Sequence, residues 1–105
     1  MIRKATITKL KEDKVDDYIR LHDEIWDEVV ELGHQAGLRN FTIYKHGVYL
    51  FSTYEYVGDN FEEDMKWKNS HEVIHRWQEE TGKCTDFVID DIKTIELEEI
   101  FFNKF

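Results

Sequence analysis

Proline is absent from this sequence, cysteine occurs once, and glycine occurs five times in 105 residues. Without proline no position lacks a backbone donor, so the helices are expected to run without a break. The single cysteine, Cys84, excludes a disulfide bond within the chain. No apolar run approaches the ~20 residues of a membrane-spanning helix, and the N-terminal residues lack the apolar core of a secretion signal. These features predict a cytoplasmic protein.

Basic residues are also scarce, with 14 Lys and Arg against 23 Asp and Glu and a formal net charge of -9. Nucleic acids and anionic membranes select positively charged surfaces, so neither is an expected partner. The length and a hydrophobic fraction of 41% fit one globular domain over residues 1–105. The few glycines are scattered, so no glycine-rich phosphate-binding loop is predicted.

The hydrophobic pattern predicts a mixed fold. Strands are predicted where apolar and polar residues alternate, at residues 2–9, 39–45, 48–57 and 94–102. Helices are predicted where apolar residues recur every three or four positions, at residues 13–31, 61–67 and 71–81. Residues 83–93 are predicted to be a connecting loop with some extended character. The resulting order, β-α-β-β-α-β with the second helical region split, is typical of a ferredoxin-like α+β fold with helices on one face of one sheet.

Helix ends are predicted from capping residues. Asp13 is the expected N-cap of the first helix, and Gly37 is expected to adopt a left-handed conformation after it. Asn69 and Glu72 resemble a capping box for the helix at 71–81.

The strand at 48–57 carries large apolar residues on both faces. Leu50 and Tyr54 point one way, while Tyr49 and Phe51 point the other. Helices cover only one face of such a sheet, so a second surface is expected to cover the other face. The simplest such surface is a second copy of the chain, which predicts a homodimer in the form of a dimeric α+β barrel.

The first helix carries an unusual triplet, Tyr18, His22 and Trp26, at positions i, i+4 and i+8. This spacing places the three side chains on one helical face. His22 occupies a place in an otherwise apolar stripe, so its imidazole is expected to point into the protein. The alternative is a core histidine that makes one hydrogen bond and has no catalytic role.

Aromatic residues predict the kind of ligand. Five of them are expected to converge around His22 if the main helices pack on the same sheet: Tyr18, Trp26, Phe41, Tyr44 and Trp77. Flat rings around a polar donor suit a neutral carbohydrate, because the rings stack on the C–H faces of a sugar while polar groups orient its hydroxyls. The alternative is that each ring is ordinary core packing.

Residues His71 to His75 match the zinc-protease pattern H-E-x-x-H. A zinc site needs a third ligand, and no histidine follows His75. Gln78 also stands where the extended pattern requires glycine. No metal site is therefore predicted.

One set of residues matches a known family over nearly the full length of the chain. The set comprises Met1 to Ala5, Tyr18, Arg20, His22, Ile25-Trp26, Glu28, Gly37, Asn40, Ile43-Tyr44, Leu50-Phe51, Glu55, Arg76-Trp77, and Glu96-Leu97-x-Glu99-x-Phe101. With these residues at these spacings, the chain resembles the L-rhamnose mutarotase family. The resemblance implies a dimeric ferredoxin-like barrel that acts on a neutral 6-deoxy monosaccharide without a cofactor.

The resemblance also implies residue roles. His22 matches the family's proton donor, and Tyr18 and Trp77 match residues that contact the sugar. The sequence departs from the family pattern at Phe41, where a second sugar-contacting tyrosine is common, and at Gln78, where a second tryptophan is common. These two departures leave the identity of the sugar open.

Mutarotation interconverts the α and β anomers of a reducing sugar through its open aldehyde, by general acid–base catalysis. Histidine suits this chemistry because its ordinary pKa of ~6.5 allows proton transfer in both directions near neutrality. We expect His22 to protonate the ring oxygen, Trp26 and Trp77 to pack against the sugar, and Arg76 to bind its hydroxyls or to form a surface ion pair. The opposing base is Tyr18, a carboxylate or water.

Three alternatives remain open at the level of sequence. The first keeps the chemistry and changes the sugar, for example to L-fucose. The second is a dimeric α+β barrel that binds a small apolar ligand or acts as a cofactor-free oxygenase. The third is an interaction module without catalysis, which no feature of the sequence favours.

Overall fold

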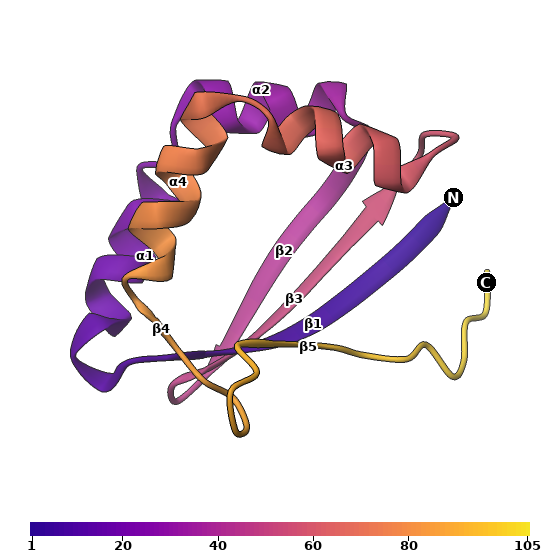
Figure 1. The fold of residues 1–105 in the computed structure, drawn as a ribbon. Coiled ribbons are helices and arrows are strands. Elements are labelled where there is room, and N and C mark those ends of the chain that lie inside the picture. The colour runs from indigo at the N-terminus through magenta and orange to yellow at the C-terminus, as the bar shows by residue number, and fades with distance from the viewer.

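The computed structural model describes residues 1–105, and a single antiparallel sheet is its centre (Figure 1). Its elements are β1 (Ile2–Leu10), the 3-10 turn η1 (Glu12–Lys14), α1 (Val15–Asp23), α2 (Asp27–Gln35), β2 (Leu38–His46), β3 (Tyr49–Tyr56), α3 (Phe61–Asn69), α4 (Glu72–Gly82), β4 (Thr85–Asp86) and β5 (Thr94–Glu96). The strand order is β2-β3-β1-β4, and β5 also pairs with β1. The predicted ferredoxin-like fold is confirmed. None of the helices combines the length and apolarity needed to cross a membrane.

The predicted helix over 13–31 is wrong as a continuous element. It is divided into α1 and α2, and Trp26 between them is extended, with φ -69° and ψ 133°. Figure 1 shows the helices on one side of the sheet, with the α1 and α2 arms meeting at an angle. The helix α4 contacts both α2 and α3. The break lets α1 pack against Leu50 of β3 while α2 packs on β2. Absence of proline was therefore not sufficient for a continuous helix, because tertiary packing outweighs local propensity.

Two predicted caps are also wrong. Lys14, not Asp13, is the N-cap of α1, and His71 is the N-cap of α4, in both cases without a side-chain hydrogen bond. Asn69 belongs to the end of α3, where its Oδ1 accepts a hydrogen bond from Gln78 at 3.2 Å. Asn60 caps α3 instead, by accepting from the backbone N–H of Glu63.

A β-bulge in β2 decides which side chains face the helices. Leu38 is paired with Tyr56 and Ile43 with Ser52, and the register shifts by one residue between them. The extra residue is accommodated at Asn40, whose φ is +53°. Because a one-residue shift reverses the faces, the bulge places Phe41 on the same side as Leu38 and Ile43.

The buried residues on the helix-facing side of β3 are Leu50, Ser52 and Tyr56. At one end Leu50 packs with Leu10 and Cys84. At the other end Tyr56 is 1% exposed and lies against the chain at Gly37, whose φ of +98° confirms the predicted left-handed conformation. Between these ends, Ser52 and Tyr54 continue the same face of β3.

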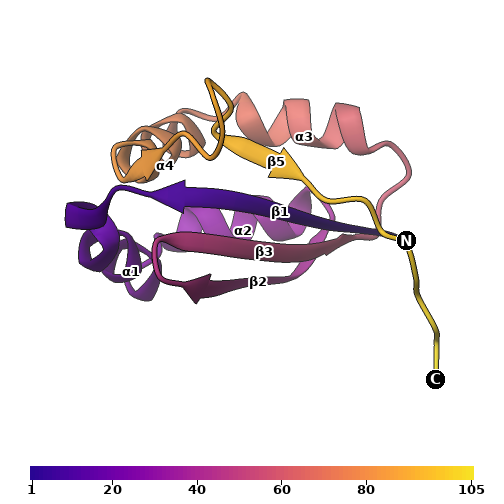
Figure 2. The same ribbon diagram turned by 90° about the horizontal axis from the view of Figure 1, so that it is seen from below.

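The opposite face of the sheet has no helix in front of it (Figure 2). Tyr44, Tyr49 and Phe51 are exposed there. The last predicted strand, 94–102, is shorter than expected, since β5 ends at Glu96. Leu97 still donates its backbone N–H to the Ala5 carbonyl oxygen of β1 at 2.8 Å, and Glu99 forms an ion pair with Arg3 at 2.7 Å. The end of the chain then projects past the N-terminus (Figure 2).

Candidate active site

Tyr18 and His22 lie one helical turn apart on α1, with ring centroids separated by 4.3 Å. The Nδ1 atom of His22 is 3.0 Å from the backbone carbonyl oxygen of Tyr18. A carbonyl oxygen only accepts, so Nδ1 carries the hydrogen and donates it. The neutral imidazole therefore has its lone pair on Nε2, which becomes the acid when the ring is protonated. Both side chains are partly buried, as predicted from the helical spacing.

Trp77 of α4 joins this pair to the start of α2. Its indole lies edge-on to the His22 ring at 5.2 Å and to the Trp26 ring at 5.3 Å. The guanidinium carbon of Arg76 is 6.0 Å from the centre of the Trp26 ring. Five predicted site residues thus form one chain of contacts around the bend between α1 and α2, although Trp26 does not share a helix with His22.

Tyr18 is a neutral phenol over the whole physiological range. It packs against the core formed by Leu10, Leu50 and Cys84. This burial raises the pKa of Tyr18 to about 12, with a smaller contribution from the nearby Cys84 thiol. A phenol with this pKa donates a hydrogen bond at neutral pH and does not act as a base.

The sheet contributes two further aromatic rings on the helix-facing side. Phe41 and Tyr54 are stacked, with centroids 5.3 Å apart and an angle of 2° between the rings. Phe41 is 56% exposed, so solvent reaches this side of the sheet at that point.

The predicted convergence is wrong for Tyr44. Tyr44 follows Ile43 directly and is paired with the exposed Phe51, so strand alternation directs it to the uncovered face. It is 62% exposed there.

A family model described as L-rhamnose mutarotase matches residues 3–102. The chain belongs to the L-rhamnose mutarotase family. An L-rhamnose mutarotase of Klebsiella pneumoniae is 33% identical over 81 residues, which are 73% of each chain. One of Bacillus subtilis is 29% identical over 97% of this chain and 98% of its own. The crystal structure of an L-rhamnose mutarotase from Formosa agariphila superposes with a TM-score of 0.78 at 22% identity, over 99% of this chain and 100% of the other.

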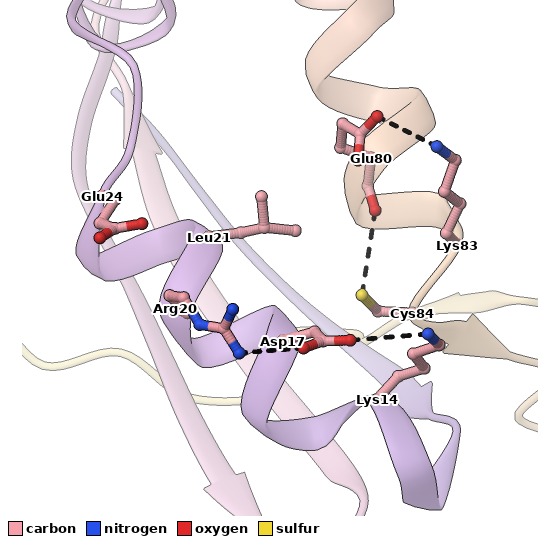
Figure 3. Close-up of a pocket in the computed structure, with 8 residues that line it drawn as sticks. All are labelled: Lys14, Asp17, Arg20, Leu21, Glu24, Glu80, Lys83 and Cys84. Atoms are coloured by element: carbon pink, nitrogen blue, oxygen red, sulfur yellow. Dashed lines mark hydrogen bonds and ion pairs between the residues drawn. The ribbon is translucent and has the colours of Figure 1, made fainter.

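Two pockets on the surface of this mutarotase-family chain are lined by residues other than His22. One, of about 350 Å³, lies between α1 and the end of α4 (Figure 3) and is lined by Lys14, Asp17, Arg20, Leu21, Glu24, Glu80, Lys83 and Cys84. Asp17 pairs there with Lys14 and Arg20, and Glu80 with Lys83. Exposed ion pairs of this kind contribute little energy, and the mutual pairing of these charges leaves no single-sign surface for a charged ligand.

Arg76 lies on the border of the site. It is exposed and lines a second outer pocket, of about 410 Å³, with Glu28, Glu31, Leu32, His71, Glu72 and Val73. It forms none of the four ion pairs of the structure, so the predicted alternative of a surface salt bridge is not observed.

The H-E-x-x-H segment has a structural role at its first histidine. The Nδ1 atom of His71 is 2.9 Å from the carbonyl oxygen of Trp67, and so donates to the end of α3. His75 is exposed on α4. No three side chains of metal-binding type meet here or elsewhere in the chain.

Sequence reasoning missed the stacking of Tyr54 on Phe41. The alternation of Tyr54 with Leu50 indicated the correct face of the sheet, but its contact with Phe41 depends on the bulge at Asn40. No pattern in the sequence marks that bulge, because Asn40 stands in an otherwise ordinary strand.

Proposed function

We propose that this chain interconverts the α and β anomers of L-rhamnose by general acid–base catalysis, with His22 as the proton donor. The hydrogen bond from His22 Nδ1 to the Tyr18 carbonyl oxygen carries the proposal. It fixes the tautomer, so Nε2 is the nitrogen that gives and takes the proton. Membership of the L-rhamnose mutarotase family supports the substrate.

The reaction requires two proton transfers in each direction. The protonated Nε2 of His22 donates to the ring oxygen as the C1–O5 bond breaks, while the C1 hydroxyl loses its proton to an acceptor and becomes the aldehyde. Rotation about C1–C2 then exposes the other face of the carbonyl. Ring closure reverses both transfers, so His22 recovers its proton and no cofactor is consumed. The proposed enzyme is therefore an isomerase of the aldose 1-epimerase type.

Tyr18 orients the sugar as a hydrogen-bond donor. Its pKa of about 12 removes it from the candidates for the opposing base, since the phenolate is absent near neutrality. The acceptor of the C1 proton is a carboxylate or water. Glu96 is a carboxylate on the helix-facing side, because it is paired with Thr6, which is paired with the buried Ser52.

The tryptophans and Arg76 complete the proposed binding surface. Trp77 presents its indole ring to His22, and Trp26 lies against Trp77. Such indole rings suit the apolar C–H face and methyl group of a 6-deoxy sugar. Arg76 lies beside Trp26 and carries five N–H donors that suit sugar hydroxyls.

The proposed active form is a cytoplasmic homodimer. The exposed apolar residues on the uncovered face of the sheet support the second copy. The free thiol of Cys84 supports a reducing compartment.

Exchange NMR between the α and β anomeric protons of L-rhamnose, at catalytic protein concentration, tests the proposal. We expect accelerated exchange that falls by about 10²–10⁴-fold in His22→Ala, since positioned acid–base groups give factors of this size. His75→Ala is the matched control, because His75 is exposed on α4 and its side chain forms none of the hydrogen bonds or ion pairs of the structure. Full activity in His22→Ala would falsify the role of His22.

L-Fucose is the second candidate substrate. Phe41 lacks the hydroxyl of the tyrosine that the family resemblance led us to expect, and the specificity of a sugar site depends on such hydroxyls. The same exchange measurement on L-fucose compares the two sugars directly. Family membership favours both over a cofactor-free oxygenase or an apolar-ligand carrier.

A further inference from the structure

Two stacked rings lie on the helix-facing side of the sheet. Phe41 of β2 and Tyr54 of β3 lie parallel at 5.3 Å, on the face of the sheet that the helices cover. Tyr54 alternates with Ser52 and Tyr56, which are 9% and 1% exposed, so its side chain points to the same side as theirs. Phe41 nevertheless remains more than half exposed, so the helices do not close over this pair.

The position of Tyr54 along β3 indicates which part of the helical layer lies opposite the Phe41–Tyr54 pair. Four residues before Tyr54, Leu50 belongs to the core against which Tyr18 of α1 packs. Two residues after Tyr54, Tyr56 lies against Gly37, just beyond the end of α2. Tyr54 is thus opposite the stretch between these contacts, where α1 ends and Trp26 leads into α2.

The hydroxyl of Tyr54 is available for a ligand. The neighbouring Tyr56 hydroxyl donates to Asp64 and accepts from the backbone N–H of Asn60. Tyr54 has no comparable partner. Burial, and secondarily the negative charge of Glu96, raise the pKa of Tyr54, so its hydroxyl is neutral and keeps its proton for donation.

We propose that Tyr54 is a sugar-binding and specificity-determining residue. Its hydroxyl, which is on β3 instead of β2, takes the place of the hydroxyl that Phe41 lacks. Phe41 then acts as the apolar platform that holds the Tyr54 ring in place. This inference rests on the proposed mutarotase function and assigns a substrate contact to a second strand of the sheet. A site built to hydrogen-bond a sugar hydroxyl discriminates against sugars that do not place a hydroxyl there.

Three variants test the assignment by exchange NMR and by quenching of tryptophan fluorescence in a titration with L-rhamnose. Tyr54→Phe should raise KM and the dissociation constant about fivefold, the size of one net hydrogen bond, with kcat changed less than twofold. Phe41→Tyr combined with Tyr54→Phe should recover most of the lost affinity, because it returns a hydroxyl to the same ring pair. Tyr49→Phe is the matched control on the uncovered face and should leave both constants unchanged.

The outcomes separate this inference from the proposed function. If the unmodified chain neither binds L-rhamnose or L-fucose nor accelerates their anomer exchange, both proposals are wrong. If it does so and Tyr54→Phe binds equally well, the Tyr54 assignment alone is wrong. A loss of affinity that the double variant does not recover means that a hydroxyl at position 41 cannot substitute for that of Tyr54, and it overturns the part of the assignment in which the Tyr54 hydroxyl replaces the one that Phe41 lacks.

Discussion

At the scale of single residues, the site depends on the assignment of two protons. The Tyr18 backbone accepts a hydrogen bond from His22 Nδ1, and the Tyr18 side chain keeps its own proton because it is buried. One residue therefore orients the imidazole with its main chain and offers a donor with its side chain. In the proposed mechanism, this division separates the acid of the reaction from the group that positions the sugar.

The substitution Tyr18→Phe tests that division. We expect the catalytic efficiency to fall about 5- to 10-fold, because one hydrogen bond is lost while the proton donor remains. The shape of the pH profile between pH 7 and 10 should not change, since the pKa of Tyr18 of about 12 lies above that range. A fall of about 10²-fold or more, with loss of a basic limb, would instead identify Tyr18 as the base.

At the scale of elements, the sequence predicted the order of strands and helices and the helical face shared by Tyr18 and His22. Alternation and helical spacing are local properties, so they are readable without the fold. The break before Trp26 and the bulge at Asn40 were not predictable in this way, since both depend on how helices and strands fit together. The position of Tyr44 was misjudged for a simpler reason. Tyr44 directly follows Ile43 in a strand, and successive side chains of a strand point to opposite faces.

The turn that follows α2 depends on a glycine. Gly37 has φ +98°, and a Cβ built there would lie 2.9 Å from Cε1 of the buried Tyr56 ring. Gly37→Ala should destabilise the protein by about 2 kcal/mol or more, because left-handed strain alone costs an alanine about 1–2 kcal/mol. Urea unfolding followed by circular dichroism measures this change.

Gly82→Ala is the matched control for Gly37→Ala. Gly82 is the last residue of α4, and a Cβ there would meet no atom within 4 Å. Alanine is favoured over glycine in a helix, so this change should be neutral or stabilising by up to about 1 kcal/mol. Equal destabilisation by both variants would contradict the explanation based on Tyr56.

At the scale of the whole molecule, the two faces of the sheet have different roles. The helix-facing side carries the proposed sugar site, while the uncovered face exposes Tyr44, Tyr49 and Phe51. The segment after β5 adds Ile100 and Phe101, which are 90% and 76% exposed. Apolar residues concentrated in this way mark an association surface. Because Tyr44 belongs to this surface, it does not join the proposed sugar site of its own copy of the chain.

The homodimer predicts a mass of about twice the 12.7 kDa of one chain in light scattering at micromolar concentration. Phe51→Lys should shift the protein toward the monomer, because it places a charge in the centre of the uncovered face. Phe51→Leu keeps an apolar side chain there and should remain dimeric, which makes it the control for loss of the ring. Far-ultraviolet circular dichroism verifies that each variant is folded.

A monomeric mass for the unmodified chain would refute the dimer. If the monomeric Phe51→Lys variant keeps full mutarotase activity, the site is complete within one copy, as the contacts among Tyr18, His22 and Trp77 indicate.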